Sequence, residues 1–250
     1  MRILIFLFAL MAPIAQAQDV SAKMAYADGR FIEAADIAET VGDADNLAFA
    51  ARSLLAASVA TDDEPDPALI QRANTLATQA LQQDDLHIEG RIQLAISLSL
   101  TARPMSTRDA LRSGHGETAR DLAKAVLEDD PDNSYAHGFL SVWNVEVLRR
   151  GGRIGAAVLG ASVKKGRAHY QAAIAAQPDE ASLHWQWARV LTALNARKYR
   201  DEIQMALSAA LAASTETAIE TVMQERARKI ETAIATQSRE VVEGLAARML

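Results

Sequence analysis

Residues 117–140 read ETARDLAKAVLEDDPDNSYAHGFL, and residues 166–188 read GRAHYQAAIAAQPDEASLHWQWA. Both stretches carry a small residue, then positions four and seven residues later on the same helical face, and a proline twelve residues later. Small residues on one face let a second helix approach closely, and the proline ends the helix. The two stretches therefore predict paired helices in a repeated hairpin. The aligned residues are Ala119, Ala123, Val126 and Pro131 in the first stretch and Gly166, Tyr170, Ala173 and Pro178 in the second.

This spacing resembles the second helix of the tetratricopeptide repeat (TPR) family. Two weaker copies precede it, the second with Asp85 in place of the proline. The resemblance implies an all-α, TPR-like α-solenoid of antiparallel helical hairpins that ends in a C-terminal capping helix. The weaker copies are Ala34, Ala38 and Val41, and Ala73, Ala77 and Ala80.

The rest of the sequence also predicts helices. Apolar residues recur three and four positions apart, as in Leu94, Leu98 and Ala102, and no long stretch alternates with a period of two. Half of the residues are apolar but only 5% are aromatic, and alanine, the strongest helix former, dominates the apolar set. We expect about five hairpins in residues 18–214 and a capping helix or helices in residues 215–250.

The repeat spacing is longer than in the TPR family. Asp85 and Pro131 are 46 positions apart and Pro131 and Pro178 are 47 positions apart, against a family period of about 34. The extra residues fall between the first and second helices of both units, in residues 101–114 and 149–165. Insertions at one position of a solenoid line up on one face, so we expect these two segments to lie together.

The first 17 residues have the layout of a secretory signal peptide. Arg2 precedes an apolar run, and Pro13 and the triplet Ala15-Gln16-Ala17 follow it. We expect cleavage near Ala17 and a periplasmic or secreted location. No later stretch reaches about 18 consecutive apolar residues, so no stable membrane anchor is expected.

Composition excludes several functional classes. The chain has no cysteine, which excludes disulfides, cysteine–zinc sites and a thiol nucleophile. The formal net charge of −6 argues against nucleic-acid binding. The histidines and acids form no metal-ligand or catalytic spacing, so we expect no metal, no cofactor and no enzymatic activity.

We interpret the insertion 149–165, RRGGRIGAAVLGASVKK, as a basic, glycine-hinged loop. It has the glycine spacing of a phosphate-binding loop but lacks the lysine that such a loop requires. Three alternatives stay open: a small-residue loop or short helix packed on its hairpin, a site for an acidic protein or ligand, and shallow contact with anionic membranes. The candidate partner-binding cations are Arg149, Arg150, Arg153, Lys164 and Lys165.

Two histidines occupy equivalent positions. His137 and His184 each lie six residues after the proline of their unit, with Trp185 and Trp187 beside His184. Packing between hairpins is one function for these aromatic residues. The alternative is a groove that binds a partner, because tryptophan is favoured at protein interfaces.

The stretches VMQERARKIETAIATQ (222–237) and GRAHYQAAI (166–174) resemble the T component of tripartite (TRAP-type) solute transporters. That resemblance implies a small-ligand-binding accessory protein. The TPR resemblance implies a scaffold that holds a protein or peptide, and the predicted signal peptide implies that this scaffold is exported. The basic insertion favours an acidic segment of the partner. The oligomeric state stays open.

Overall fold

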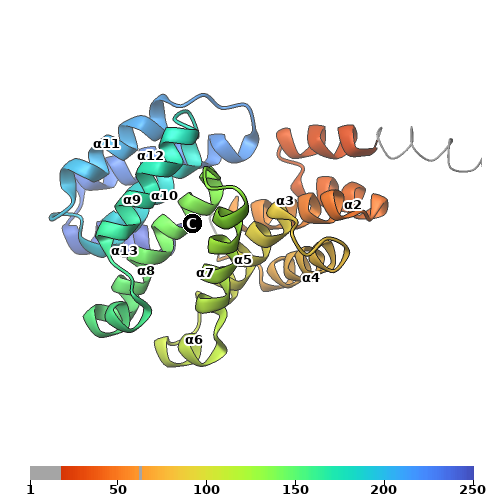
Figure 1. Ribbon diagram of the computed structural model, residues 1–250. Coiled ribbons are helices and arrows are strands. Elements are labelled where there is room, and N and C mark those ends of the chain that lie inside the picture. Colours follow the sequence, from red (N-terminus) through yellow and green to blue (C-terminus); the bar gives the residue numbers. More distant parts are fainter. Residues whose placement is uncertain (1–17, 62–63) are drawn as a thin grey trace, which may run out of the picture. The chain divides into compact units, whose positions relative to one another are not determined.

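In the computed structural model, residues 18–61 and 64–250 are described, and every regular element among them is a helix (Figure 1). The signal peptide predicted in residues 1–17 lies outside the described residues. Residues 18–27 form the first helical stretch. The helices that follow are α2 (Phe31–Val41), α3 (Ala44–Val59), α4 (Pro67–Gln83), α5 (Ile88–Ala102), α6 (Thr107–Ser113), α7 (His115–Asp129), α8 (Ser134–Leu159), α9 (Val163–Ala176), α10 (Ala181–Asn195), α11 (Arg200–Ala212), α12 (Ala218–Thr236) and α13 (Arg239–Arg248).

The helices form two compact units, one ending at Thr101 and one from Ala102 to Leu250. In unit 1, α3 packs against both α2 and α4. In unit 2, α8 pairs with α9 and α10 pairs with α11, while α10 also contacts α8, α12 and α13. The helix α10 is thus the centre of unit 2.

Short polar side chains begin many of these helices. Asp43 accepts a hydrogen bond from the Asn46 N–H at the start of α3, and Asn133 accepts one from the Ala136 N–H at the start of α8. Such caps satisfy main-chain donors that have no partner within the helix. Asp43 and Asn133 therefore stand at the starts of their helices for a structural reason.

The small residues of the repeat pattern lie where helices touch, which confirms the prediction. Ala119, Ala123 and Val126 are completely buried. Gly166 is the extreme case, because a Cβ atom added there would lie 2.8 Å from the carbonyl oxygen of Ser141. Contacts this short allow only glycine, so α8 and α9 approach each other more closely than any side chain permits.

The junction between one hairpin and the next is held by a recurring hydrogen bond. A side chain six residues after the junction residue donates to the main-chain carbonyl of that residue. This repetition confirms that His137 and His184 are structural equivalents, and it adds Arg91 as the third member. The pairs are Arg91–Asp85 (2.9 Å), His137–Pro131 (3.0 Å) and His184–Pro178 (2.9 Å).

The insertion 149–165 is mostly helical, so the predicted loop was wrong. The helix α8 continues to Leu159 and is broken only at Gly152, whose φ is +62°. Ala156, Ala157 and Leu159 are strong helix formers, which explains why the helix resumes after the glycine. The predicted hinge does lie on a glycine, Gly152, but it occupies this one residue instead of a whole loop.

The two insertions contact each other, as predicted. The guanidinium group of Arg150 donates to the carbonyl oxygens of Ala102 (3.3 Å) and Met105 (2.7 Å), just before α6. Thr107 at the start of α6 also reaches the carbonyl of Arg150. The face shared by the insertions is therefore a property of unit 2 alone.

Residues 215–250 form the two helices α12 and α13. The Glu220 carboxylate accepts a hydrogen bond from the Thr217 N–H at 2.8 Å, which caps the start of α12. The helix α12 packs against α10 and α11, and α13 packs against α10 and α12.

The close approach at Gly166 makes a testable prediction. We expect Gly166→Ala to destabilise unit 2 by roughly 1–3 kcal/mol, because the new methyl group would overlap the backbone of α8. The matched control is Gly155→Ala, where an added Cβ meets nothing within 4 Å. There the better helix propensity of alanine should stabilise unit 2 by up to about 1 kcal/mol.

Urea unfolding followed by tryptophan fluorescence reports on unit 2, because Trp143, Trp185 and Trp187 all lie in it. Equal effects of the two substitutions would contradict the tight contact.

Candidate functional site

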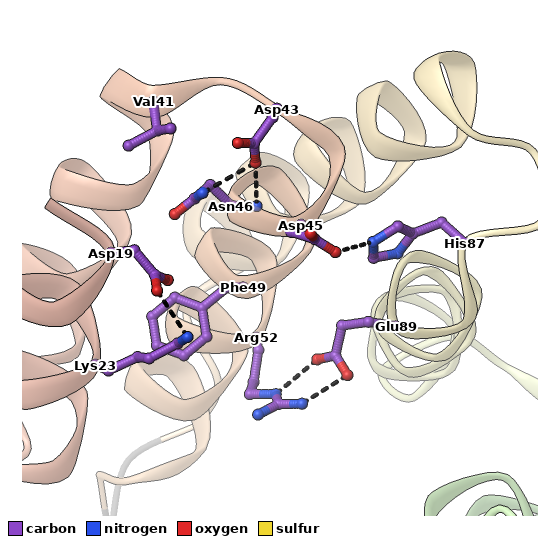
Figure 2. Close-up of a pocket in the computed structure, with 10 residues that line it drawn as sticks. All are labelled: Asp19, Lys23, Val41, Asp43, Asp45, Asn46, Phe49, Arg52, His87 and Glu89. Carbon is purple, nitrogen blue, oxygen red and sulfur yellow. Dashed lines mark hydrogen bonds and ion pairs between the residues drawn. The ribbon is translucent and has the colours of Figure 1, made fainter. Parts of the chain in front are cut away.

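Unit 1 contains a hollow of about 460 Å³ on one side of its first helices (Figure 2). Its wall is built mainly by residues 18–27, by α3 and by the start of α5, which are the first helices of successive hairpins in the repeat pattern, and Val41 of the second helix α2 also lines it. In a row of first helices, the second helices cover one side. We call the opposite side, which the second helices leave uncovered, the first-helix face. The lining residues are Asp19, Lys23, Val41, Asp43, Asp45, Asn46, Phe49, Arg52, His87 and Glu89.

Ion pairs hold the wall of this hollow together. Arg52 on α3 and Glu89 on α5 make two parallel hydrogen bonds of 2.6 Å, a geometry that fixes both side chains (Figure 2). Lys23 pairs with Asp19 at 2.8 Å within the first helix. Both cations of the hollow are therefore engaged by a carboxylate.

His87 links the start of α5 to α3. Its Nδ1 accepts a hydrogen bond from the Gly90 N–H, so its Nε2 carries the proton that is donated to Asp45 at 2.8 Å. The Asp45 side chain is nevertheless 93% exposed. This carboxylate is thus held in place by the protein and remains open to a partner.

The hollow has an excess of hydrogen-bond acceptors. Its lining has four carboxylates and two permanently charged cations, a formal charge of −2 with His87 neutral. The Oδ1 atom of Asn46 is buried and has no hydrogen-bond partner, although its amide nitrogen donates to Asp43. The acceptors that a partner can reach are therefore the carboxylates, above all the exposed Asp45.

In unit 2 the corresponding face contains a cluster of arginines around one acid. Arg189 and Arg149 both pair with Glu146, at 3.1 and 2.7 Å. Burial alone would raise the pKa of Glu146, but the two guanidinium groups outweigh burial and lower it. The Glu146 carboxylate therefore stays ionised as the counter-ion of the cluster.

Arg103 belongs to the same cluster. Burial, with the positive charge of Arg189 next in weight, lowers the pKa of Arg103 to about 10, so it stays protonated at neutral pH. One of its terminal nitrogens lies 2.7–2.9 Å from three successive main-chain carbonyl oxygens at the end of α13. The cluster thus holds more positive charge than Glu146 neutralises.

The aromatic residues predicted as groove candidates are packing residues. His184, Trp185 and Trp187 are 4%, 0% and 1% exposed, so they do not line an open groove. Tyr170 stacks on Trp187 with ring centroids 5.1 Å apart and hydrogen-bonds His184 Nδ1 at 2.8 Å. Packing between hairpins is thus supported for His184 and Trp187, whereas the buried Trp185 donates a hydrogen bond to the Leu250 carbonyl.

His137 pairs with another histidine that the sequence did not connect to it. Its Nε2 donates to the Pro131 carbonyl at 3.0 Å, and its Nδ1 lies 2.8 Å from the Nδ1 atom of His169. Burial, and then the charges of His137, Lys124 and Lys165, lower the pKa of His169 to about 4. His169 is therefore neutral at physiological pH.

The five cations predicted in residues 149–165 divide into two groups. Arg149 pairs with Glu146, Arg150 binds main-chain carbonyls, and Lys165 donates to the Gly160 carbonyl at 2.6 Å. Within the described part of the chain, only Arg153 and Lys164 of the five are exposed and have no internal partner. The segment therefore offers fewer free charges than the sequence suggests.

Two further observations concern the described residues as a whole. None of their helices combines the length and apolar character needed to cross a bilayer. Three or more side chains of metal-binding type do not come together anywhere among them.

Comparisons with known proteins identify the fold. No protein-family model and no curated protein matches the chain. Among solved structures, the crystal structure of a thermophilic TPR protein from Thermus thermophilus is similar, with a TM-score of 0.61 and 18% sequence identity. The match covers 86% of this chain and 99% of that one. The fold is a TPR-like α-solenoid. The predicted fold class is thereby confirmed. The comparison does not show the predicted resemblance to the transporter T component.

The lowered pKa of His169 predicts an acid-sensitive unit 2. An unfolded histidine, with a pKa near 6.5, binds more protons than His169 does between about pH 6.5 and 4, so the free energy of unfolding falls as the pH falls through that range. We expect His169→Gln to make this dependence shallower. Urea unfolding by tryptophan fluorescence at pH 6.5, 5.5 and 4.5 measures it, with His115→Gln as the control. A slope unchanged by His169→Gln would contradict the assignment.

Proposed function

We propose that this protein is an exported, non-enzymatic scaffold that binds a segment of another protein in the hollow of unit 1. The observation that carries the proposal is the 460 Å³ hollow formed by three successive first helices on their uncovered face. A TPR-like fold supports protein binding in general, because its stacked helices present an extended surface. The hollow gives this general expectation a location.

The chemistry of the hollow favours a segment rich in hydrogen-bond donors. The lining is net negative, and the exposed Asp45 carboxylate is an acceptor that a partner can reach. A lysine or arginine of the partner can pair with Asp45, while Phe49 offers an apolar surface beside it. We therefore propose a basic segment for unit 1. Of the cations in residues 149–165, only Arg153 and Lys164 are exposed without a partner in the described part of the chain, so the exposed part of that segment offers little charge to the expected acidic partner.

A crosslinking experiment tests the location. We expect a photo-crosslinkable phenylalanine analogue at Phe49 to give a discrete protein adduct in cells, because the side chain lies in the hollow (Figure 2). The matched control is the same analogue at Met205, which is 73% exposed on α11 of unit 2. Asp45→Asn should weaken the adduct, since it removes a rim charge, whereas Asp201→Asn on α11 should not. An adduct of equal yield at Phe49 and Met205 would contradict a site in the hollow.

A second function, that of a small-ligand-binding accessory protein, is favoured by the volume of the same hollow. A volume of 460 Å³ lies within the range of ligand pockets, although its charged, ion-paired lining is more polar than such pockets usually are. Native mass spectrometry of the protein purified from its cells separates the two functions. A bound small molecule that Asp45→Asn releases, together with no protein adduct at Phe49, would favour the ligand.

Export is tested separately from binding. We expect the mature protein outside the cytoplasm, with an amino terminus near Gln18, because residues 1–17 have the layout of a signal peptide. Cell fractionation and amino-terminal sequencing measure both. A variant that lacks residues 2–17 should stay in the cytoplasm, and a full-length cytoplasmic protein would contradict the proposal.

A further inference from the structure

The first-helix face of unit 2 is occupied by α13. The helix α10 contacts its neighbours α8 and α12 and the second helices α9 and α11. The helix α13 contacts α10 on its remaining side. The two helices run in opposite directions. Glu243 near the middle of α13 accepts a hydrogen bond from the Ala196 N–H at the end of α10, while Leu250 lies at Trp185 near the start of α10.

The end of α13 is held through its main-chain carbonyl oxygens. Arg103 contacts the carbonyls of Ala247, Arg248 and Met249. Trp185 Nε1 donates to the Leu250 carbonyl at 3.2 Å, and Arg226 donates to the same oxygen. The last carbonyls of a helix carry the negative end of its dipole, so cationic donors suit them. We call Arg103, Trp185 and Arg226 the carbonyl clasp.

The side chains of α13 contribute little to this contact. The helix has 10 residues and buries only Val242 and Ala246, while Val241 is 51% exposed. An isolated helix of this length is marginal in water. The residues Gln237 and Ser238 separate it from α12. Most of its specific bonds therefore run through main-chain atoms, which a helix of another sequence also presents.

The charge of the face favours a different occupant. Arg149 and Arg189 pair with the single carboxylate of Glu146, and the charge of Arg103 lies beside them, at the carbonyl oxygens that end α13. An acid in the last turn of a bound helix would pair with this cluster, while the helix would still present its carbonyls to the clasp.

We propose that the first-helix face of unit 2 is a second binding surface, for a short helix with an acidic carboxyl-terminal turn, and that α13 is the internal occupant that this partner displaces. The inference does not rest on the hollow of unit 1. It gives the acidic partner expected from the sequence a site at the arginine cluster, away from the exposed end of the insertion.

The test expels α13 within the full chain and supplies the segment as a peptide. The probe is a fluorescent peptide of residues 238–250 with the change Arg248→Glu, and binding is measured by fluorescence anisotropy. Val242→Asp places a charge on the buried side of α13, and the matched control Val241→Asp places it on the exposed side. We expect Val242→Asp to bind the peptide about tenfold more tightly than the wild type and the control do. Adding Arg103→Ala to Val242→Asp should abolish the gain.

Hydrogen exchange on the wild-type chain decides the question even where Val242→Asp does not fold. A displaceable occupant opens on its own, so amides of α13 should exchange at least about tenfold faster than those of α10. Arg103→Ala should accelerate exchange in α13 alone, and the exposed Arg108→Ala should not. Exchange of α13 together with α10, or no gain in peptide binding for a folded Val242→Asp chain, would overturn the proposal and make α13 a fixed part of the unit.

Discussion

The arrangement of this protein depends on how closely the two helices of a hairpin approach each other. At Gly166 the backbone of α9 lies so near the Ser141 carbonyl of α8 that no side chain fits between them. Alanines fill the equivalent positions elsewhere, and they are completely buried. Close pairing leaves little apolar surface inside each hairpin, so larger residues such as Trp185 and Leu191 fill the space where successive hairpins stack. The tight pairs thereby leave one side of the first helices uncovered.

The first-helix face differs between the two units. In unit 1 it is a hollow whose carboxylates are held by Arg52 and His87 but remain open to solvent at Asp45. In unit 2 the chain itself covers it, and the charges have the opposite sign. A net charge of −6 for the whole chain conceals this local separation. Two faces of opposite charge can select different partners, because the wrong charge on either face leaves ionised groups unpaired.

Much of the repeat could be predicted from the sequence, because small residues and prolines act locally. The positions of Ala119, Gly166 and Pro178 determine which helices pair and where they end. Burial was harder to predict, since periodicity places Trp185 and Trp187 on a helix without stating what covers them. The insertion shows a related limit: glycines suggested a loop, yet within α8 only Gly152 departs from helical geometry, and Gly160 ends the helix. The carbonyl clasp could not be predicted, because Arg103 meets residues that are more than 140 positions away.

The strength with which α13 binds the first-helix face determines how tightly a partner must bind in order to displace it. A segment joined to its site by a two-residue connection competes at an effective concentration in the millimolar range. If α13 were bound as firmly as α10, no free helix could replace it. Its small buried surface at Val242 and Ala246 reduces this advantage, while the clasp keeps the face closed when no partner is present. A partner then needs acidic residues that α13 lacks near its end, so selectivity comes from the charge of the cluster around Glu146 rather than from the shape of the face.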